Sequence, residues 1–341
     1  MTRHRVALIG LGMAVTPHAK SLLDLGDRVE VAYAMSPSAA RREAFAARFP
    51  FPTTGGLGDV LQDRSITTAA VLTPPNTHLE IATELAKAGK HILLEKPLDI
   101  STARAEQLVA ACRDAGVTLG VVLQHRFKPA AERLAAILRA GALGEIVNCS
   151  TSIRLWRPQS YYDEPGRGTK ARDGGGVLMT QGIHTLDLML SLAGPIVEVG
   201  GYTRTSPVHR METEDLVCAA VRFASGAVGV IDATTAAFPG APERIELIGT
   251  LGTASLAGTA LTVRFHDGRS EELAADASPG GTGADPMAFP HDYHLGVWRD
   301  FLDAIEQKRP PRVSGAEALK VLTLIDALLA AGAAGRAVDI R

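Results

Sequence analysis

The sequence predicts a two-domain protein in which an α/β domain with a doubly wound parallel sheet precedes an α+β domain with a large, mostly antiparallel open sheet. Its 341 residues are about twice the length of one ordinary domain. Short apolar runs alternate with helical patterns up to residue 123, and strand-like stretches follow one another after residue 124. We therefore expect domains over residues 1–123 and 124–341.

The first domain reads as consecutive βαβ units. Its expected strands are Val6–Gly10, Val29–Ala34, Thr68–Thr73, His91–Leu94 and Val117–Leu123, and its expected helices are Pro17–Leu25, Ala39–Arg48, Thr77–Ala88 and Thr102–Ala115. Strands joined by helices cross over right-handedly, so a doubly wound parallel sheet follows. The start also resembles a short signal peptide, with Arg3 and Arg5 before the apolar run Val6–Val15. We favour the strand, because that run contains two glycines with a structural purpose described below.

The second domain has a different rhythm. A helix over Ala130–Ala140 precedes long strand-like stretches, a second helix is expected over Gln181–Leu192, and Ser278–Gly283 reads as a loop. The expected strands are Ile146–Trp156, Val197–Thr205, Leu216–Phe223, Ala227–Thr234, Glu243–Gly249 and Leu261–His266. Hairpin-like turns between them favour antiparallel pairing. Two amphipathic helices, His294–Gln307 and Gly315–Ala334, end the chain.

Composition excludes several classes of protein. The formal net charge is -2, which gives no electrostatic reason to expect nucleic acid or an anionic membrane as a partner. No segment approaches the about 20 apolar residues of a membrane span. Cys112, Cys149 and Cys218 form no C-x-x-C pair, so we expect buried thiols in a reducing, cytoplasmic environment and no metal site.

A glycine-rich turn follows the first strand. Gly10-Leu-Gly12-Met13-Ala14 matches G-x-G-x-x-G at its first two glycines, and Val15 stands at the third position. Gly10 permits a tight turn, and Gly12 lets backbone amides approach a pyrophosphate at a helix N-terminus. Glycines also simply end strands, but the strand before this turn and the helix after it favour a Rossmann domain that binds a dinucleotide.

Two further segments stand at the carboxyl ends of parallel strands, where ligands bind in open α/β sheets. The first contains the candidate cofactor-binding residues Thr73, Pro74, Asn76 and His78, and the second is Glu95-Lys96-Pro97. The alternative interpretations are a plain turn for the first segment and a surface ion pair for Lys96.

Glu95-Lys96-Pro97 and the run from Gly174 to Asp187, which contains His184, resemble two signatures of the Gfo/Idh/MocA oxidoreductase family. The resemblance covers nearly the whole chain and implies that Lys96 hydrogen-bonds the reacting hydroxyl, that the Lys96-Pro97 bond is cis, and that His184 is the acid/base residue. Glu95 and Lys96 would also line the cofactor site.

The chemistry of these residue types agrees with that implication. Oxidation of an alcohol needs a hydride acceptor, which a nicotinamide supplies, and a base for the hydroxyl proton. His184 titrates near neutrality, and Lys96 as a cation stabilises alkoxide charge. A lone helical histidine is more often structural, but the glycine run before His184 favours the functional role. Many family members have an aspartate where Thr180 stands, so Thr180 would bind substrate without carrying charge, and Asp187 reads as structural.

Aromatic and arginine side chains before the second signature suit a polyhydroxylated ring. We expect Tyr161, Tyr162 and Arg167 to bind substrate, whereas Lys170 and Arg172 fit a solvated loop equally well. After the last parallel strand, His125 is a candidate for substrate binding and Arg126 for cofactor binding, because this segment resembles the family's nicotinamide edge.

The segment after the second strand predicts a preference for NADP(H), with NAD(H) possible. No acidic residue occurs there to hold a ribose 2′-hydroxyl, and Ser36, Ser38 and Arg41 suit a 2′-phosphate, with Arg42 next to them. The alternative is that Ser36 caps a helix beginning at Pro37 and that both arginines face solvent.

We therefore expect an NAD(P)-dependent oxidoreductase that transfers a hydride between the nicotinamide and a secondary alcohol or ketone of a sugar, cyclitol or related polyol. The alternatives are a glycosidase that uses bound dinucleotide transiently and a non-catalytic dinucleotide-binding regulator. An exposed sheet face favours a homodimer or homotetramer. The exact substrate and the physiological direction do not follow from the sequence.

Overall fold

The computed structural model describes residues 3–275 and 290–340, so the expected loop at 278–283 lies outside the described residues. The chain forms two compact units. The first unit contains Met1–Leu123 and Pro290–Leu319, and the second contains Gln124–Phe289 and Lys320–Arg341. The expected boundary near residue 123 agrees with this division, but the expected assignment of 290–319 to the second domain does not.

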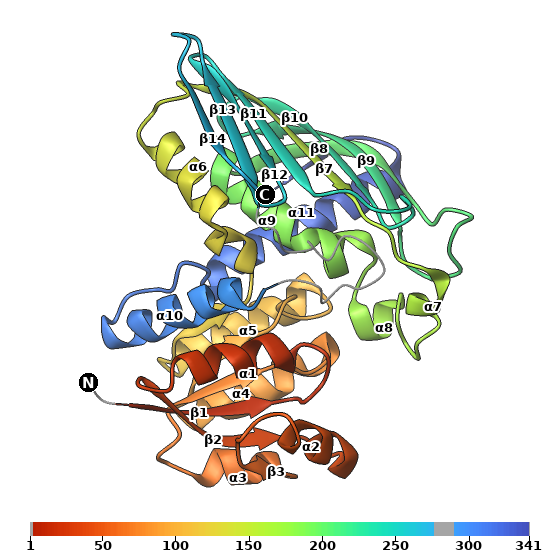
Figure 1. Cartoon of the computed structure of the whole chain (residues 1–341). Helices are drawn as coiled ribbons and strands as arrows, with labels where there is room; N and C mark the ends of the chain where they lie inside the picture. Colours follow the sequence, from red (N-terminus) through yellow and green to blue (C-terminus); the bar gives the residue numbers. More distant parts are fainter. Residues whose placement is uncertain (1–2, 276–289, 341) are drawn as a thin grey trace. The chain divides into compact units, whose positions relative to one another are not determined.

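Residues 290–319 belong to the first unit because helix α10 (Asp292–Glu306) packs there. Its residues Trp298 and Phe301 are buried in the first unit, and a Cβ placed on Gly120 would lie 2.6 Å from the Phe301 ring. After the helix, the carbonyl of Val313 accepts a hydrogen bond from the amide of Val121 at 2.9 Å. The apolar face of α10 thus covers the sheet of the first unit, and Figure 1 shows it beside α1 (Val15–Asp24).

The first unit is built on a six-stranded parallel sheet in the order β3-β2-β1-β4-β5-β6, as expected for a Rossmann domain. The strands are β1 (His4–Ile9), β2 (Val29–Met35), β3 (Thr53–Thr54), β4 (Thr68–Val71), β5 (His91–Leu94) and β6 (Leu119–Val121). The other helices are α2 (Ala39–Ala46), α3 (Leu57–Gln62), α4 (His78–Lys87) and α5 (Thr102–Asp114). Because β1 is a buried central strand, the strand interpretation of the N-terminus holds. The sequence did not predict β3, which has only two residues, or α3.

The second unit has a nine-stranded sheet in the order β14-β13-β12-β11-β7-β10-β9-β8-β15, in which only β7 and β10 pair in parallel. Its strands are β7 (Ile146–Arg154), β8 (Ile196–Arg204), β9 (Leu216–Phe223), β10 (Val228–Thr234), β11 (Arg244–Gly249), β12 (Gly252–Ala257), β13 (Ala260–Phe265), β14 (Ser270–Leu273) and β15 (Val338–Asp339). This is the open, mostly antiparallel sheet that the sequence predicts, with β12, β14 and β15 in addition.

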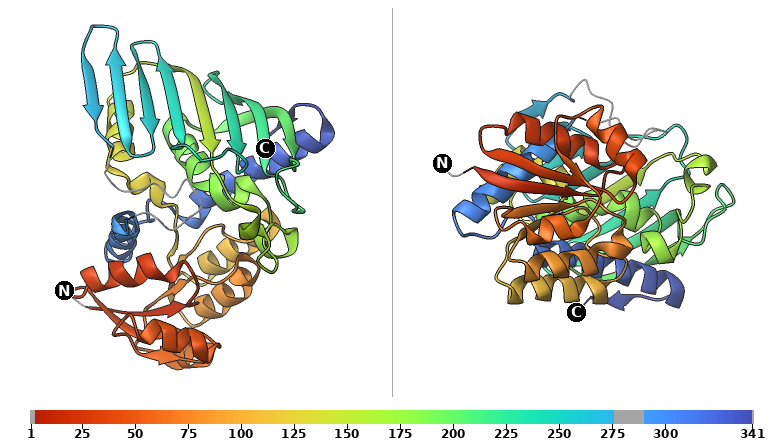
Figure 2. Two further views of the ribbon diagram at one scale, coloured as in Figure 1. Left: turned by 45° about the vertical axis from the view of Figure 1, so that its right-hand side comes forward. Right: turned by 90° about the horizontal axis from the view of Figure 1, so that it is seen from below.

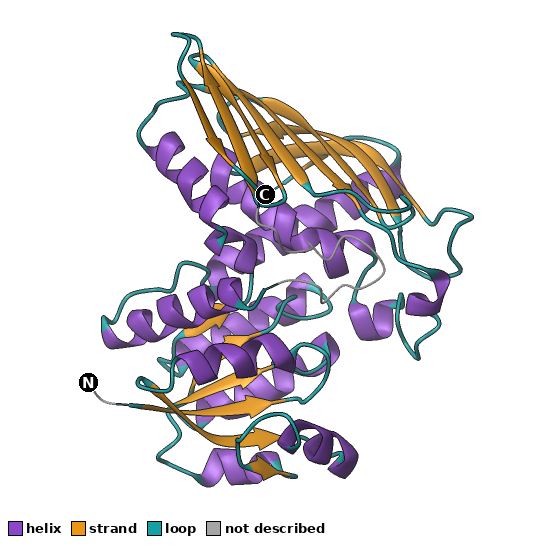
Figure 3. Ribbon diagram, viewed as in Figure 1, coloured by secondary structure: helices purple, strands orange, loops and turns teal. Residues whose placement is uncertain are grey.

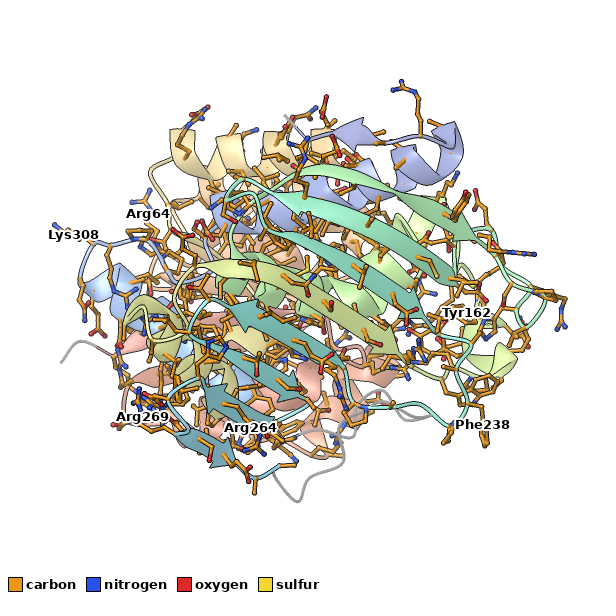
Figure 4. All side chains as sticks on the ribbon, turned by 90° about the horizontal axis from the view of Figure 1, so that it is seen from above. Arg64, Tyr162, Phe238, Arg264, Arg269 and Lys308 are labelled. Atoms are coloured by element: carbon orange, nitrogen blue, oxygen red, sulfur yellow. The ribbon has the colours of Figure 1, made fainter. Side chains whose placement is uncertain are left out.

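Helices cover one face of this sheet, as Figures 2 and 3 show. They are α6 (Pro129–Arg139), α9 (Ile183–Ala193) and the end of α11 (Gly315–Ala334), and the short helices α7 (Gln159–Tyr162) and α8 (Lys170–Asp173) lie in the segment before α9. The opposite, outer face is seen from above in Figure 4. No helix among the described residues has the length and apolarity of a membrane span.

One of the three cysteines lies exposed on the outer face of the sheet, contrary to the expectation of three buried thiols. Cys112 and Cys149 are buried, and burial raises the pKa of each to about 12. Cys218 is exposed, because side chains alternate along β9 and Val217 takes the inward position.

Candidate functional site

The glycine turn after β1 has the geometry of a phosphate cradle. Gly10 has φ +102°, and a Cβ there would lie 2.9 Å from the carbonyl carbon of Leu72, so only glycine fits. A Cβ on Gly12 would meet no atom within 4 Å. Met13 is half exposed, and Ala14 directly precedes α1. The open space at Gly12, in front of a helix N-terminus, fits the pyrophosphate of a dinucleotide.

The rim after β4 is fixed by a buried histidine. The short helix η1 (Pro75–Thr77) leaves Pro74 and Asn76 exposed, and the Thr77 hydroxyl donates to the Thr73 hydroxyl at 2.8 Å. His78 is buried, with Nε2 2.9 Å from the Thr73 carbonyl and Nδ1 3.0 Å from the Pro97 carbonyl. Contrary to our expectation for His78, this geometry suits a residue that holds two loops together better than one that contacts a cofactor.

At the end of β2, Ser38 is the helix cap. Its hydroxyl accepts a hydrogen bond from the Arg41 amide at the start of α2, so the alternative that Ser36 caps this helix is wrong. Ser36 is buried, and its carbonyl accepts from Arg42 Nη1 at 2.7 Å. The Arg41 side chain is exposed. Arg42 thus stabilises the loop, and Arg41 is left facing solvent at the helix start.

The segment after β5 brings Lys96 to the same rim. The Lys96-Pro97 peptide is cis, as the family resemblance implies, and Lys96 is half-buried. Glu95 is buried, and its Oε2 accepts a hydrogen bond from the Lys96 amide at 3.1 Å. Its Oε1 lies 3.0 Å from His18 Nε2. Glu95 is therefore engaged within the protein, where it fixes the backbone at Lys96.

In the second unit, the glycine run positions the helix that carries His184. A Cβ on Gly176 would lie 1.7 Å from the Glu214 carbonyl oxygen, so the chain passes there only as glycine. The buried Glu214 carboxylate accepts hydrogen bonds from the amides of Gly176 and Leu178 at 3.0–3.2 Å. Burial raises the pKa of Glu214. This acidic cap satisfies amides that a helix start leaves without partners.

The helix begins as a π-helical turn, η3 (Leu178–Gly182), before α9 starts at Ile183. In such a turn four residues cover less than one revolution, so Thr180 and His184 do not share a face as two residues four apart in an α-helix would. The Thr180 hydroxyl donates to the Gly176 carbonyl at 2.7 Å and also contacts the Gln181 side chain. π-Turns are frequent at functional sites.

His184 has a histidine neighbour and lies one turn before an ion pair. Its ring is 5.0 Å from the ring of His125 in η2 (Gln124–Phe127), centroid to centroid. Arg126 donates to both carboxylate oxygens of Asp187, at 2.6 and 2.8 Å, and the Asp187 side chain is 1% exposed. Asp187 is thus structural, as expected, and Arg126 anchors the segment that places His125 beside His184.

Tyr161 and Arg167 form the expected aromatic–arginine pair. Arg167 Nη1 donates to the Tyr161 hydroxyl at 2.8 Å, and Gln181 Nε2 is 3.4 Å from the same oxygen. This chain of contacts joins the loop to the π-turn that carries Thr180. Tyr162 instead is buried, with its hydroxyl 2.8 Å from Thr235 Oγ1, and burial raises its pKa. Figure 4 shows it near the end of the sheet where Phe238 lies.

Sequence reasoning missed several residues that support these side chains. His18, Trp298, Gln181 and Glu214 lack a spacing that marks them, although Gln181 lies inside the second signature. Lys170 and Arg172 lie on the short helix α8 and not in a loop; Lys170 is exposed, and the half-buried Arg172 donates to the Pro165 carbonyl at 2.6 Å.

Comparison with known proteins gives matches along the chain. The family model described as "Oxidoreductase family, NAD-binding Rossmann fold" matches residues 4–123, and the one described as "GFO/IDH/MocA C-terminal domain" matches residues 131–255. Myo-inositol 2-dehydrogenase of Thermotoga maritima is 25% identical over 94% of this chain and 93% of its own.

Two solved structures have the same fold. The WlbA dehydrogenase from Bordetella pertussis, in complex with NADH and UDP-GlcNAcA, superposes with a TM-score of 0.85 at 28% identity, over 100% of this chain and 99% of the other. Levoglucosan dehydrogenase, in complex with NADH and levoglucosan, has a TM-score of 0.88 at 24% identity over 99% and 100%. With both family signatures in place on this fold, the chain belongs to the Gfo/Idh/MocA oxidoreductase family.

Proposed function

We propose that this protein is an NAD(P)-dependent dehydrogenase or reductase acting on a secondary alcohol or ketone of a sugar, cyclitol or related polyol. The observation that supports the proposal is the position of the two signature residues, Lys96 and His184. Lys96 stands at a fixed rim of the dinucleotide unit, and His184 begins a capped helix beside His125. A cation and a titratable base are the two protein groups that this reaction requires.

Each residue has a definite task in the oxidation direction. The nicotinamide, when bound, supplies the hydride acceptor. A ring nitrogen of His184 takes the hydroxyl proton, and the Lys96 ammonium stabilises the alkoxide that forms as the proton leaves. Tyr161, Arg167 and Thr180 offer hydrogen bonds to the remaining hydroxyls, and His125 offers a further ring nitrogen. In the reduction direction His184 returns the proton.

The test is a screen of polyols and sugars with NAD⁺ and NADP⁺, followed by the absorbance of the reduced nicotinamide. With a substrate in hand, Lys96→Ala and His184→Ala are expected to lower kcat by about two to four orders of magnitude. Dinucleotide binding, measured by fluorescence, should remain close to that of the wild type. Full activity of Lys96→Ala would contradict the assignment. Dinucleotide binding without any turnover across the screen would favour a regulator instead.

We propose NADP(H) as the preferred dinucleotide, with NAD(H) accepted. No acidic residue stands between Val31 and Arg42, and the exposed Arg41 lies at the N-terminus of α2, where a 2′-phosphate would be stabilised by the arginine charge and by the helix dipole. Both solved relatives described above contain NADH, so the preference needs a direct test. Arg41→Ala should raise the KM for NADP⁺ and leave that for NAD⁺ nearly unchanged. Equal effects on both cofactors would contradict the proposal.

We also propose a cytoplasmic homodimer or homotetramer that associates through the outer face of the nine-stranded sheet. Tyr202, Val228, Val230 and Ile248 are 45–79% exposed on that face, beside charged side chains such as Arg222 and Glu246, and apolar side chains gathered on one exposed face with a polar surround mark a candidate interaction surface. Light scattering during gel filtration tests this, and Val230→Lys should shift the mass towards that of a monomer. A monomeric wild type would contradict it.

A further inference from the structure

A buried cluster of polar side chains lies directly behind Lys96 in the first unit. His18 of α1 and Trp298 of α10 are both 0% exposed, Glu95 is 8% exposed and His294 is 2% exposed. Trp298 Nε1 donates to His18 Nδ1 at 3.0 Å, and His18 Nε2 lies 3.0 Å from Glu95 Oε1. Figure 1 shows the two helices side by side.

The indole decides how His18 is protonated. An indole nitrogen can only donate a hydrogen bond, so Nδ1 of His18 must be the acceptor and carry no proton. The single ring proton is then on Nε2, from which it is donated to Glu95. A second proton would have to sit on Nδ1, facing the indole N–H. Turning the ring over does not help, since ring carbons would then face both partners. Trp298 thus holds His18 neutral.

The same geometry argues against a metal ion. The ligand atoms of His18, Glu95 and His294 lie within 4.8 Å of one another, which suits a cation. A histidine that binds a metal through Nε2 donates from Nδ1 to an acceptor. Here Nδ1 faces the Trp298 donor instead, so His18 cannot serve as such a ligand without losing that bond.

Because His18 stays neutral, Glu95 keeps its full negative charge. Burial by itself raises the pKa of Glu95, the hydrogen bond from His18 lowers it, and the net direction is down. His294 Nε2 is 3.9 Å from Glu95 Oε1, and burial lowers the pKa of His294 to about 3, so this ring does not neutralise the carboxylate either. His291, which also lowers the pKa of His294, pairs with Asp24 at 2.7 Å.

We propose that Trp298, His18 and Glu95 form a positioning chain that keeps a constant negative charge beside Lys96 across the neutral pH range. Glu95 also accepts from the Lys96 amide, so one carboxylate both fixes the turn and favours the ammonium form of the side chain. This inference rests on the proposed role of Lys96 as a cation in catalysis. None of the three residues needs to touch the substrate.

The first experiment uses the wild-type full chain and needs no substrate. ¹⁵N NMR of the histidine rings should show His18 as the Nε2–H tautomer, with an unprotonated Nδ1. In Trp298→Phe, which removes the donor, a proton on Nδ1 of His18 should become detectable. Phe301→Leu, which removes a ring packed against Trp298 but keeps the indole donor, should leave the His18 tautomer unchanged. A protonated Nδ1 on His18 in the wild type would overturn the proposal.

The second experiment measures the pKa of Lys96 from the pH dependence of its acetylation, followed by mass spectrometry. Glu95→Gln keeps the shape of the side chain and removes its charge, so this pKa should fall by about one unit or more. An unchanged Lys96 pKa would overturn the proposal. Since neither readout involves turnover, a wrong substrate class would leave both results intact. Once a substrate is known, Trp298→Phe should alter the pH profile of kcat/KM, whereas Phe301→Leu should leave the shape of that profile unchanged.

Discussion

Replacing Asp187 by asparagine tests whether the buried ion pair under the His125–His184 segment sets both stability and activity. The Asp187 side chain is 1% exposed and that of Arg126 is 10% exposed, so water screens the pair little. Removing one partner of a buried pair typically costs about 3–5 kcal/mol, because the other charge is left uncompensated. Asparagine still accepts one hydrogen bond, which places the expected loss near the lower end, about 3 kcal/mol.

A second pair in the same unit provides a matched control. Arg133 Nη2 donates to Glu271 Oε2 at 2.6 Å, but the two side chains are 48% and 29% exposed, and they lie on the helix-covered side of the sheet, where Glu271 pairs with the buried Val263. Glu271→Gln is therefore expected to cost no more than about 1 kcal/mol. Both losses are measured by urea unfolding followed by circular dichroism. Equal losses for the two variants would refute the argument that burial, and not the bond itself, sets the magnitude.

Activity separates the two roles of the Asp187 pair. Release of Arg126 lets η2 move, and a displacement of about 1 Å at a catalytic group can lower the rate about 10²-fold. The double variant Arg126→Met/Asp187→Leu removes both charges, so it should recover most of the stability. It should recover little of kcat, since the anchor of His125 is still missing. Full recovery of kcat would show that the segment needs no such anchor.

Three further predictions concern the turn, the π-helix and the buried cluster. Gly10→Ala should destabilise the protein by about 1–3 kcal/mol, as measured by calorimetry, because the new Cβ would meet the backbone of Leu72. Gly12→Ala should fold normally but bind dinucleotide more weakly, as measured by fluorescence titration. Thr180→Asp should change the pH–rate profile and cost about 1 kcal/mol, since the lost hydroxyl donates to a carbonyl; an unchanged profile would place residue 180 outside the proton path. Burial lowers the pKa of His294 to about 3. Below about pH 6.5 the His294 ring is therefore protonated in the unfolded chain but stays neutral in the folded chain. Stability should therefore fall by about 2 kcal/mol between pH 7 and pH 5 through this group, and His294→Gln should show a flatter dependence in urea titrations.

The sequence by itself determined the features that depend on near neighbours. Apolar runs and helical periodicity located five of the six strands in the first unit, and the order of these elements implied the doubly wound sheet. The glycine turn at Gly10 and the motif at Lys96 were found in the same way, since each packs its chemistry into a few consecutive residues. The second signature likewise identified His184 and the unusual Thr180.

Only the tertiary structure decided which distant residues support that chemistry. Trp298 and His18 are 280 positions apart, Arg126 and Asp187 are 61 apart, and Glu214 caps a helix start 38 residues before it. Tertiary structure also decided that residues 290–319 belong to the first unit and that Cys218 is exposed. A hydrogen bond or a buried contact leaves no periodicity in the chain when its partners come from different elements, so only the folded arrangement of those elements reveals it.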